Sequence, residues 1–236
     1  MAAGGDAPRP SWGQGNWRSA LALFIYAVAF SYAYVSLSAA TAALLLFGAV
    51  QVTMIGHGLW CGERLHGLQL IGLVLALAGL VGLLLPGLSA PPMFGAALML
   101  AAGVAWGVYS LRGKGAGDAT RVTAGNFLRT VPVAIVLILL MPHGETLDYA
   151  GAGYAVASGA LASGVGCAIW YTVLPALNST RAAIVQLCVP VIAAIGGIVL
   201  LGELLTLRLV LASAAVLKGI SLVILEKPGA VALRRA

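Results

Sequence analysis

The sequence is poor in charge, and acidic residues are scarcest. Only 8% of its 236 residues are charged, compared with about 25% in soluble domains, and 13 basic residues outnumber seven acidic ones. Two runs without any charge, Ser19–Gly62 and Leu68–Leu111, each last 44 residues. A helix needs about 20 apolar residues to cross a bilayer, whereas barrel strands alternate apolar and polar residues. The composition therefore excludes a soluble domain and predicts an all-α membrane protein.

Cysteine is also scarce, and catalytic motifs are missing. The three cysteines lie inside apolar runs without metal-ligand or disulfide spacing, so we predict small buried side chains. The three histidines are scattered, and neither H-E-x-x-H nor G-x-S-x-G occurs. We therefore predict no catalytic residue, no metal site, no cofactor and no enzymatic activity. Because the basic residues form no stripe, we expect no nucleic-acid partner.

Eight transmembrane helices are predicted from the apolar segments. A polar tail at 1–18 precedes them, and a basic tail at 227–236 follows them. The third helix begins after Gly67 and ends at Pro86. The other seven are expected at Ser19–Leu37, Ala39–Gly62, Met93–Leu111, Val122–Met141, Ala152–Leu174, Thr180–Leu201 and Thr206–Leu225.

The basic residues predict the orientation. With eight helices, ten of them fall on the side of the two termini, and only Arg208 falls on the other side. Lys and Arg concentrate in cytoplasmic loops. We therefore expect a multi-pass protein of the cytoplasmic membrane with both termini in the cytoplasm.

A repeat organises the chain. Leu37–Gly79 and Leu177–Gly219 align without a gap at ten identical positions, including the pairs Gly62/Gly202 and Glu63/Glu203. Five predicted helices separate each helix from its equivalent, and an odd separation reverses direction across the membrane. The fold prediction is a helix bundle of inverted five-helix repeats, which is typical of transporters. The first repeat, at 19–86, is incomplete with three helices, and the second, at 93–226, is complete with five.

Two motifs carry a resemblance to a known family. They are Trp106-Gly-Val-Tyr109 and the paired patterns Gly62-Glu63 with Gly79 and Gly202-Glu203 with Gly219. Through these motifs the chain resembles the EamA family of the drug/metabolite transporter superfamily, and the resemblance extends from Trp17 to Ile224.

The resemblance implies a central cavity and secondary transport of small metabolites, often outward, across the bacterial cytoplasmic membrane. Members have two inverted five-helix repeats, so the first two helices of that pattern are missing here. The chain also departs at Val50, which stands where the second copy has Pro190. We expect the two halves to differ in flexibility.

Pro190 and two glutamines are the first candidates for a transport site. Proline cannot donate a backbone hydrogen bond, so Pro190 should free the carbonyl of Gln186 and form a hinge near mid-span. This free carbonyl beside the Gln186 amide would suit substrate binding. In the other half, the corresponding candidate is Gln51, one position from the equivalent of Pro190. The alternative is a kink whose carbonyl is satisfied by Ser, Thr or water.

Aromatic side chains with polar tips are the second group of candidates. They could grip a solute with an apolar body and orient it with one donor. Anchoring at the membrane interface is the alternative, favoured for Trp170 and Tyr171. Trp106 and Tyr109 are preferred for the cavity. The candidate substrate-binding aromatics are Tyr34, Trp106, Tyr109 and Trp170.

Three further groups could titrate or pair. Lys218 lies within a predicted span, and an intramembrane charge suggests a function such as coupling; a neutral lysine facing a carbonyl is the alternative. His57 could carry a proton, although a hydrogen-bonded interior histidine is favoured. Glu63 and Glu203 would lie on opposite faces, and we expect each to cap the helix that follows it.

The leading functional prediction is a secondary transporter that exports small metabolites by alternating access between the repeats. The second is a truncated or assembly-dependent membrane protein without transport of its own, and an integral membrane enzyme ranks last. The expected partners are a small-molecule substrate, the lipid bilayer and, in a homo-oligomer, further copies of the chain.

Overall fold

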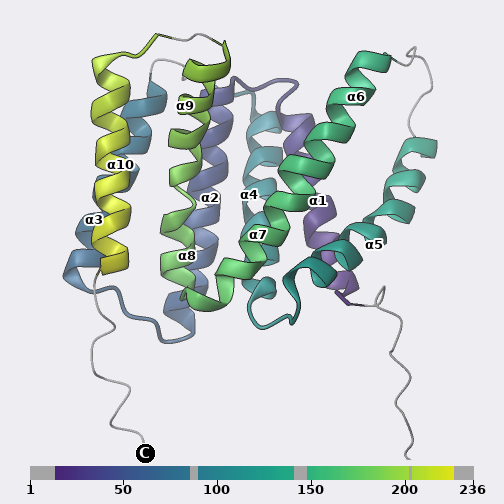
Figure 1. Cartoon of the computed structure of the whole chain (residues 1–236), viewed down its shortest axis with the longest axis horizontal. Coiled ribbons are helices and arrows are strands. Elements are labelled where there is room, and N and C mark those ends of the chain that lie inside the picture. Colours follow the sequence, from purple (N-terminus) through teal and green to yellow (C-terminus); the bar gives the residue numbers. More distant parts are fainter. Residues whose placement is uncertain (1–13, 86–89, 141–147, 202–203, 226–236) are drawn as a thin grey trace, which may run out of the picture. The chain divides into compact units, whose positions relative to one another are not determined.

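The computed structural model describes residues 14–85, 90–140, 148–201 and 204–225 (Figure 1). These residues form helices without strands, which confirms the all-α prediction. Seven helices are long and apolar enough to span a membrane, and α1 is a shorter apolar helix. In chain order the elements are α1 (Trp17–Ala33), α2 (Ala39–Trp60), α3 (Gly67–Leu84), α4 (Met93–Gly113), α5 (Ala119–Leu140), α6 (Tyr149–Ala157), η3 (Ser158–Val165), α7 (Gly166–Val173), η4 (Leu174–Ala176), α8 (Ser179–Val185), α9 (Cys188–Leu201) and α10 (Leu207–Leu225).

Two of the predicted helices are interrupted. The sixth starts at Tyr149 rather than Ala152, because Asp148 accepts from the N–H groups of Ala150 and Gly151. It continues as α6, the π-helical η3, α7 and the 3₁₀ turn η4. The seventh is divided into α8 and α9. The predicted limits Pro86 and Met141 lie outside the described residues.

The first predicted helix is shorter than expected. It ends at Ala33 rather than Leu37, and the next helix begins at Ala39. Ser38 is extended and accepts from the N–H of Thr41, so it caps α2. Asn178, at the equivalent position of the second copy, caps α8 in the same way through Arg181 N–H.

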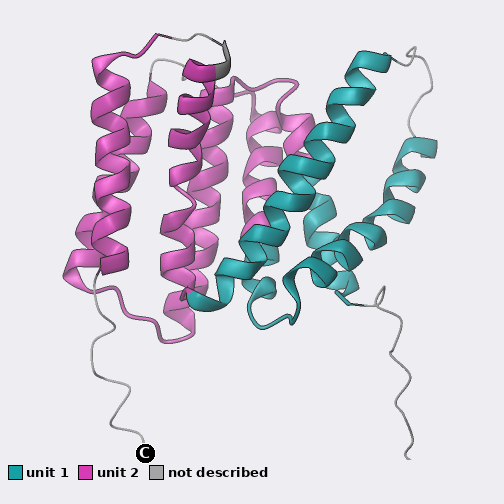
Figure 2. Ribbon diagram, in the orientation of Figure 1, with its two compact units in different colours: residues 1–28, 108–176 teal, residues 29–107, 177–236 magenta. Residues whose placement is uncertain are grey.

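The described chain divides into two compact units (Figure 2). Unit 1 comprises residues 1–28 and 108–176, and unit 2 comprises 29–107 and 177–236. Helices α1 and α4 contribute to both units. Unit 2 therefore contains α2 and α3 from the first copy of the repeat and α8, α9 and α10 from the second.

In unit 2, α3 and α10 pack closely in antiparallel directions (Figure 1). A Cβ atom on Gly72 would lie 2.6 Å from the carbonyl oxygen of Gly219, and one on Gly79 would lie 2.8 Å from that of Ala212. Small residues let membrane helices approach this closely. Gly72 and Ala212 occupy equivalent positions of the two copies, as do Gly79 and Gly219, so the two contacts are reciprocal.

Glu63 joins the end of α2 to the start of α8, which also run antiparallel. Its carboxylate accepts from the backbone N–H of Ser179 at 2.8 Å and of Thr180 at 3.0 Å, and from the Thr180 hydroxyl. An anion at this place complements the positive end of the helix dipole.

The prediction that Glu63 caps the following helix is wrong. That helix, α3, has His66 at its N-cap and Gln69 in a capping box. Gly62 turns the chain with φ of 87° and is followed by Glu63. Glu203 lies outside the described residues.

We predict that Gly219→Ala destabilises the protein. The added methyl would press on Gly72 and Ala76 across the interface, and overpacking typically costs about 1–3 kcal/mol. Thermal denaturation in detergent, followed by intrinsic fluorescence, measures the effect. Gly48→Ala in α2 is the matched control, because its Cβ would meet nothing within 4 Å. Equal melting temperatures for the two variants would contradict the proposed close contact.

A second prediction concerns Glu63 and pH. Partial burial would raise the pKa of Glu63, but the hydrogen bonds from Thr180 and Ser179 outweigh it and lower the pKa below its ordinary value of 4.5. Its stabilising contribution is therefore complete above about pH 4.5 and is lost as pH falls through the lowered pKa.

Glu63→Ala should cost about 0.5–2 kcal/mol of stability near pH 7, as for other helix caps. Its difference from the unmodified protein should shrink below pH 4.5. Melting curves at several pH values measure both effects, with the exposed neighbour Arg64→Gln as a control. A difference independent of pH would show that the charge has no role.

Candidate functional site

The candidate site in unit 2 is built around the break between α8 and α9. Gln186 and Leu187 form a turn there, one helical turn before Pro190. The backbone N–H groups of both residues point to the carbonyl of Ile184. In a regular α-helix they would instead donate to the carbonyls of Ala182 and Ala183.

Two glutamine side chains donate to these two carbonyls. Gln51 Nε2, from α2, donates to Ala183 O at 2.7 Å, and Gln186 Nε2 donates to Ala182 O at 3.3 Å. Both glutamines are buried, with 4% and 5% of their surface exposed. The break therefore brings two buried amide side chains together between α2 and α8.

Trp106 and Met54 complete the cluster. Trp106 Nε1, on α4, donates to Gln186 Oε1, and Gln186 Nε2 lies 3.1 Å from Met54 Sδ. Gln51 Oε1 is buried and has no hydrogen-bond partner among the described residues. We call Gln51, Met54, Trp106 and Gln186 the glutamine cluster. It combines an aromatic ring, a thioether and a buried acceptor without a partner among the described residues.

The prediction that Pro190 frees the carbonyl of Gln186 is wrong in its details. That carbonyl accepts from Val189 N–H at 3.1 Å. The carbonyls released by the break are those of Ala182 and Ala183, one turn earlier. Helix α2, which has Val50 at the position equivalent to Pro190, runs unbroken from Ala39 to Trp60.

Tyr109 and Trp170 lie in unit 1 and make different contacts. Tyr109 is fully buried, and its ring stacks on that of Tyr171 with centroids 4.8 Å apart. Trp170 Nε1 donates to Ser110 Oγ at 3.0 Å. Tyr171 is buried, and its hydroxyl donates to Tyr109 O at 2.8 Å, so its predicted place in an interfacial belt is wrong.

The remaining predicted residues are exposed. Tyr34 follows α1, with its ring 4.7 Å from that of Phe30. His57 lies in the last turn of α2, with a ring nitrogen 3.7 Å from Cys61 Sγ. Lys218 lies on an exposed face of α10. A role for His57 or Lys218 in coupling stays a prediction.

Several groups of the site were not predicted from the sequence. Met54 follows Gln51 by three residues on the same helix, and this spacing could have indicated a shared face. No sequence signal indicated the carbonyls of Ala182 and Ala183. Among the cysteines, Cys167 is buried as predicted, but Cys61 is exposed at the C-cap of α2.

Comparison with known proteins gives concordant results. An uncharacterized protein of Pseudomonas aeruginosa is 58% identical over 217 residues, which cover 92% of this chain and 75% of that protein. An uncharacterized transporter of Archaeoglobus fulgidus is 28% identical over 213 residues, covering 86% of this chain and 74% of that protein.

The fold also has a counterpart among solved structures. One crystal structure, 23% identical in sequence, has a TM-score of 0.71 and covers 92% of this chain and 76% of its own. The model of the EamA-like transporter family matches residues 4–85 and 93–225. These matches cover most of the chain, and the described helices include seven that could span a membrane. The chain is therefore a multi-pass membrane protein that belongs to the EamA-like transporter family.

Proposed function

We propose that this protein is a secondary transporter that exports small metabolites across the bacterial cytoplasmic membrane. The observation that carries the proposal is the glutamine cluster at the break between α8 and α9. Interrupted helices with polar groups near mid-membrane are typical of substrate sites in transporters. Membership of a transporter family supports the same function.

Alternating access between inverted repeats is the proposed mechanism. Two features of unit 2 support it: α2 runs antiparallel to α8, and α3 runs antiparallel to α10. The reciprocal contacts of Gly72 with Gly219 and of Gly79 with Ala212 fit a two-fold relation between the copies. The break at Gln186 would be the hinge, and α2 has no such break. Pro190 would keep the helix interrupted there, because it lacks a backbone N–H.

The proposed substrate is a small polar or amphipathic metabolite. Gln51 Oε1 would accept from a donor on the solute, because it is buried without a partner among the described residues. Trp106 and Met54 would contact the apolar part. Tyr34, Tyr109 and Trp170 stay predictions as substrate contacts, since each makes other contacts in the described chain.

The proposed orientation follows the positive-inside rule, with both termini in the cytoplasm. Cysteine-accessibility labelling in intact cells tests it. Single cysteines introduced on the two sides, at Arg64 and Arg208, should react with an impermeant reagent only at position 208.

Flux in proteoliposomes tests the function. Metabolites that accumulate in the medium of cells overexpressing the chain would first be identified by mass spectrometry. The purified chain should then move the radiolabelled metabolite down its gradient. Absence of flux both for this chain and for a version extended by any in-frame coding sequence found upstream of Met1 would contradict the proposal. Flux seen only with such an extension or with a partner chain would support the alternative, an assembly-dependent protein.

We predict that Pro190→Ala slows transport while raising thermal stability. Alanine can supply the N–H that proline lacks and favours a regular helix. Initial flux rates and melting temperatures measure the two effects. Pro132→Ala, inside α5, is the matched control and should leave flux unchanged. Equal losses of flux in Pro190→Ala and Pro132→Ala would show that the break between α8 and α9 has no special role in transport.

A further prediction concerns Trp106. Trp106→Phe keeps an aromatic ring but removes the N–H that binds Gln186. A lost hydrogen bond of about 0.5–1.5 kcal/mol corresponds to roughly a two- to tenfold rise in KM for flux. Trp60→Phe is the control, because Trp60 is 92% exposed at the end of α2. An unchanged KM in Trp106→Phe would show that the Trp106 N–H does not contribute to the substrate site.

A further inference from the structure

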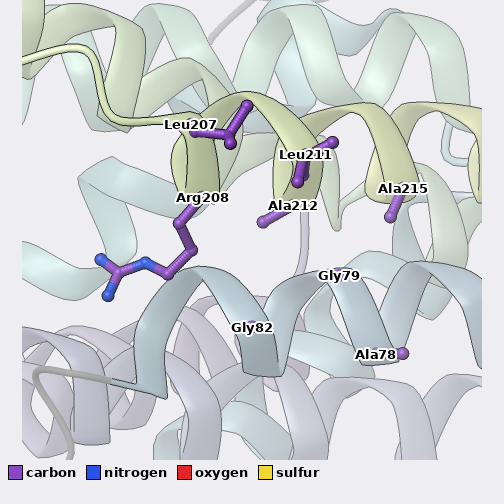
Figure 3. Close-up of a pocket in the computed structure, with 8 residues that line it drawn as sticks. All are labelled: Ala78, Gly79, Gly82, Leu207, Arg208, Leu211, Ala212 and Ala215. Atoms are coloured by element: carbon purple, nitrogen blue, oxygen red, sulfur yellow. The ribbon is translucent and has the colours of Figure 1, made fainter.

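An apolar groove runs along the pair of helices α3 and α10 in unit 2 (Figure 3). It has a volume of about 510 Å³ and is open to the surface. Small-molecule sites occupy about 300–1,000 Å³. The walls include Gly79 and Gly82 of α3 and Leu207, Leu211 and Ala212 of α10. Neither the glutamine cluster nor any other group of the proposed transport site lines this groove.

The two glycines in the groove differ in their surroundings. A side chain on Gly79 would collide with α10, so close helix packing explains that residue. A Cβ atom on Gly82 would meet no described atom within 4 Å, and Gly82 does not have a positive φ. Glycine inside a helix costs about 1 kcal/mol relative to alanine. The effect of Gly82 is to keep the groove open.

One end of the groove is cationic. Of the described residues that line it, Arg208 alone is charged, and it is exposed in the first turn of α10. In Figure 3 its side chain extends from α10 at the end of the groove marked by Leu207 and Gly82. The surface thus has an apolar channel along two membrane helices and a guanidinium at its end.

We propose that this groove binds one acyl chain of an anionic phospholipid, whose phosphate pairs with Arg208. The channel is apolar along its length, as a hydrocarbon chain requires, and the planar guanidinium suits bidentate contacts with phosphate oxygens. Both helices are long and apolar enough to lie in a bilayer, where such lipids are abundant.

A second copy of the chain fits this surface less well. Two chains docked symmetrically through the groove would bring their Arg208 side chains toward each other, and juxtaposed like charges oppose association. Among the described residues that line the groove, none is acidic and able to offset them. An anionic lipid supplies the missing opposite charge.

Native mass spectrometry of the full chain in detergent tests the proposal. Phosphatidylglycerol and phosphatidylcholine with identical acyl chains would be titrated separately, and the first should bind more tightly. Arg208→Gln should weaken phosphatidylglycerol binding about two- to fivefold, as expected for an exposed ion pair. Arg121→Gln is the control, since Arg121 is also exposed in the first turn of a helix but lies outside the groove.

A second variant tests the channel. Gly82→Leu places a side chain in the groove and should remove the tightest lipid adduct. Gly48→Leu is its control, because a Cβ at that position also meets nothing within 4 Å. Circular dichroism and the elution volume would show that both variants are folded.

Four results would overturn the proposal. The first two are equal affinity for the two lipids and phosphatidylglycerol binding that neither Arg208→Gln nor Gly82→Leu changes. The third is oleate that displaces phosphatidylglycerol at equal concentration, and the fourth is a dimer mass that Gly82→Leu abolishes. The third result would assign the groove to a free fatty acid, and the fourth would assign it to a second copy of the chain.

Discussion

The requirement that every backbone polar group in hydrocarbon find a partner governs the centre of unit 2. The break at Gln186 and Leu187 withdraws two N–H groups from the carbonyls of Ala182 and Ala183. Side-chain amides replace them, one from the same helix and one from Gln51 on α2. The irregular backbone is thus stabilised by the two glutamines, and Gln51 is also proposed to contact a solute.

The two copies of the repeat are joined by two kinds of contact. Between α3 and α10, the absence of side chains at Gly72, Gly79 and Gly219 permits close approach of two backbones. Between α2 and α8, the Glu63 carboxylate binds the N–H groups that begin α8. The first contact depends on shape and the second on charge. Neither of these contacts involves the break between α8 and α9.

Charged residues are sparse in the sequence, and the few that are present have different physical effects. Glu63 stabilises a helix start outside the spans, whereas Arg208 marks the end of an apolar groove. Lys218 lies exposed on α10 and joins neither arrangement in the described chain. A charge within a predicted span was therefore a weaker guide to the candidate site than the neutral Gln51 and Gln186.

The sequence by itself determined the all-α membrane class, the eight helical segments and the repeat, because uncharged runs and equivalent Gly-Glu pairs depend only on the order of residues. It also indicated Gln51, Gln186 and Trp106. Only the tertiary structure decided which carbonyls the amides bind and which helix Glu63 caps. Those partners lie 116 or more residues away for Glu63 and 132 for Gln51. Local sequence patterns do not predict such contacts, because packing between helices brings these groups together.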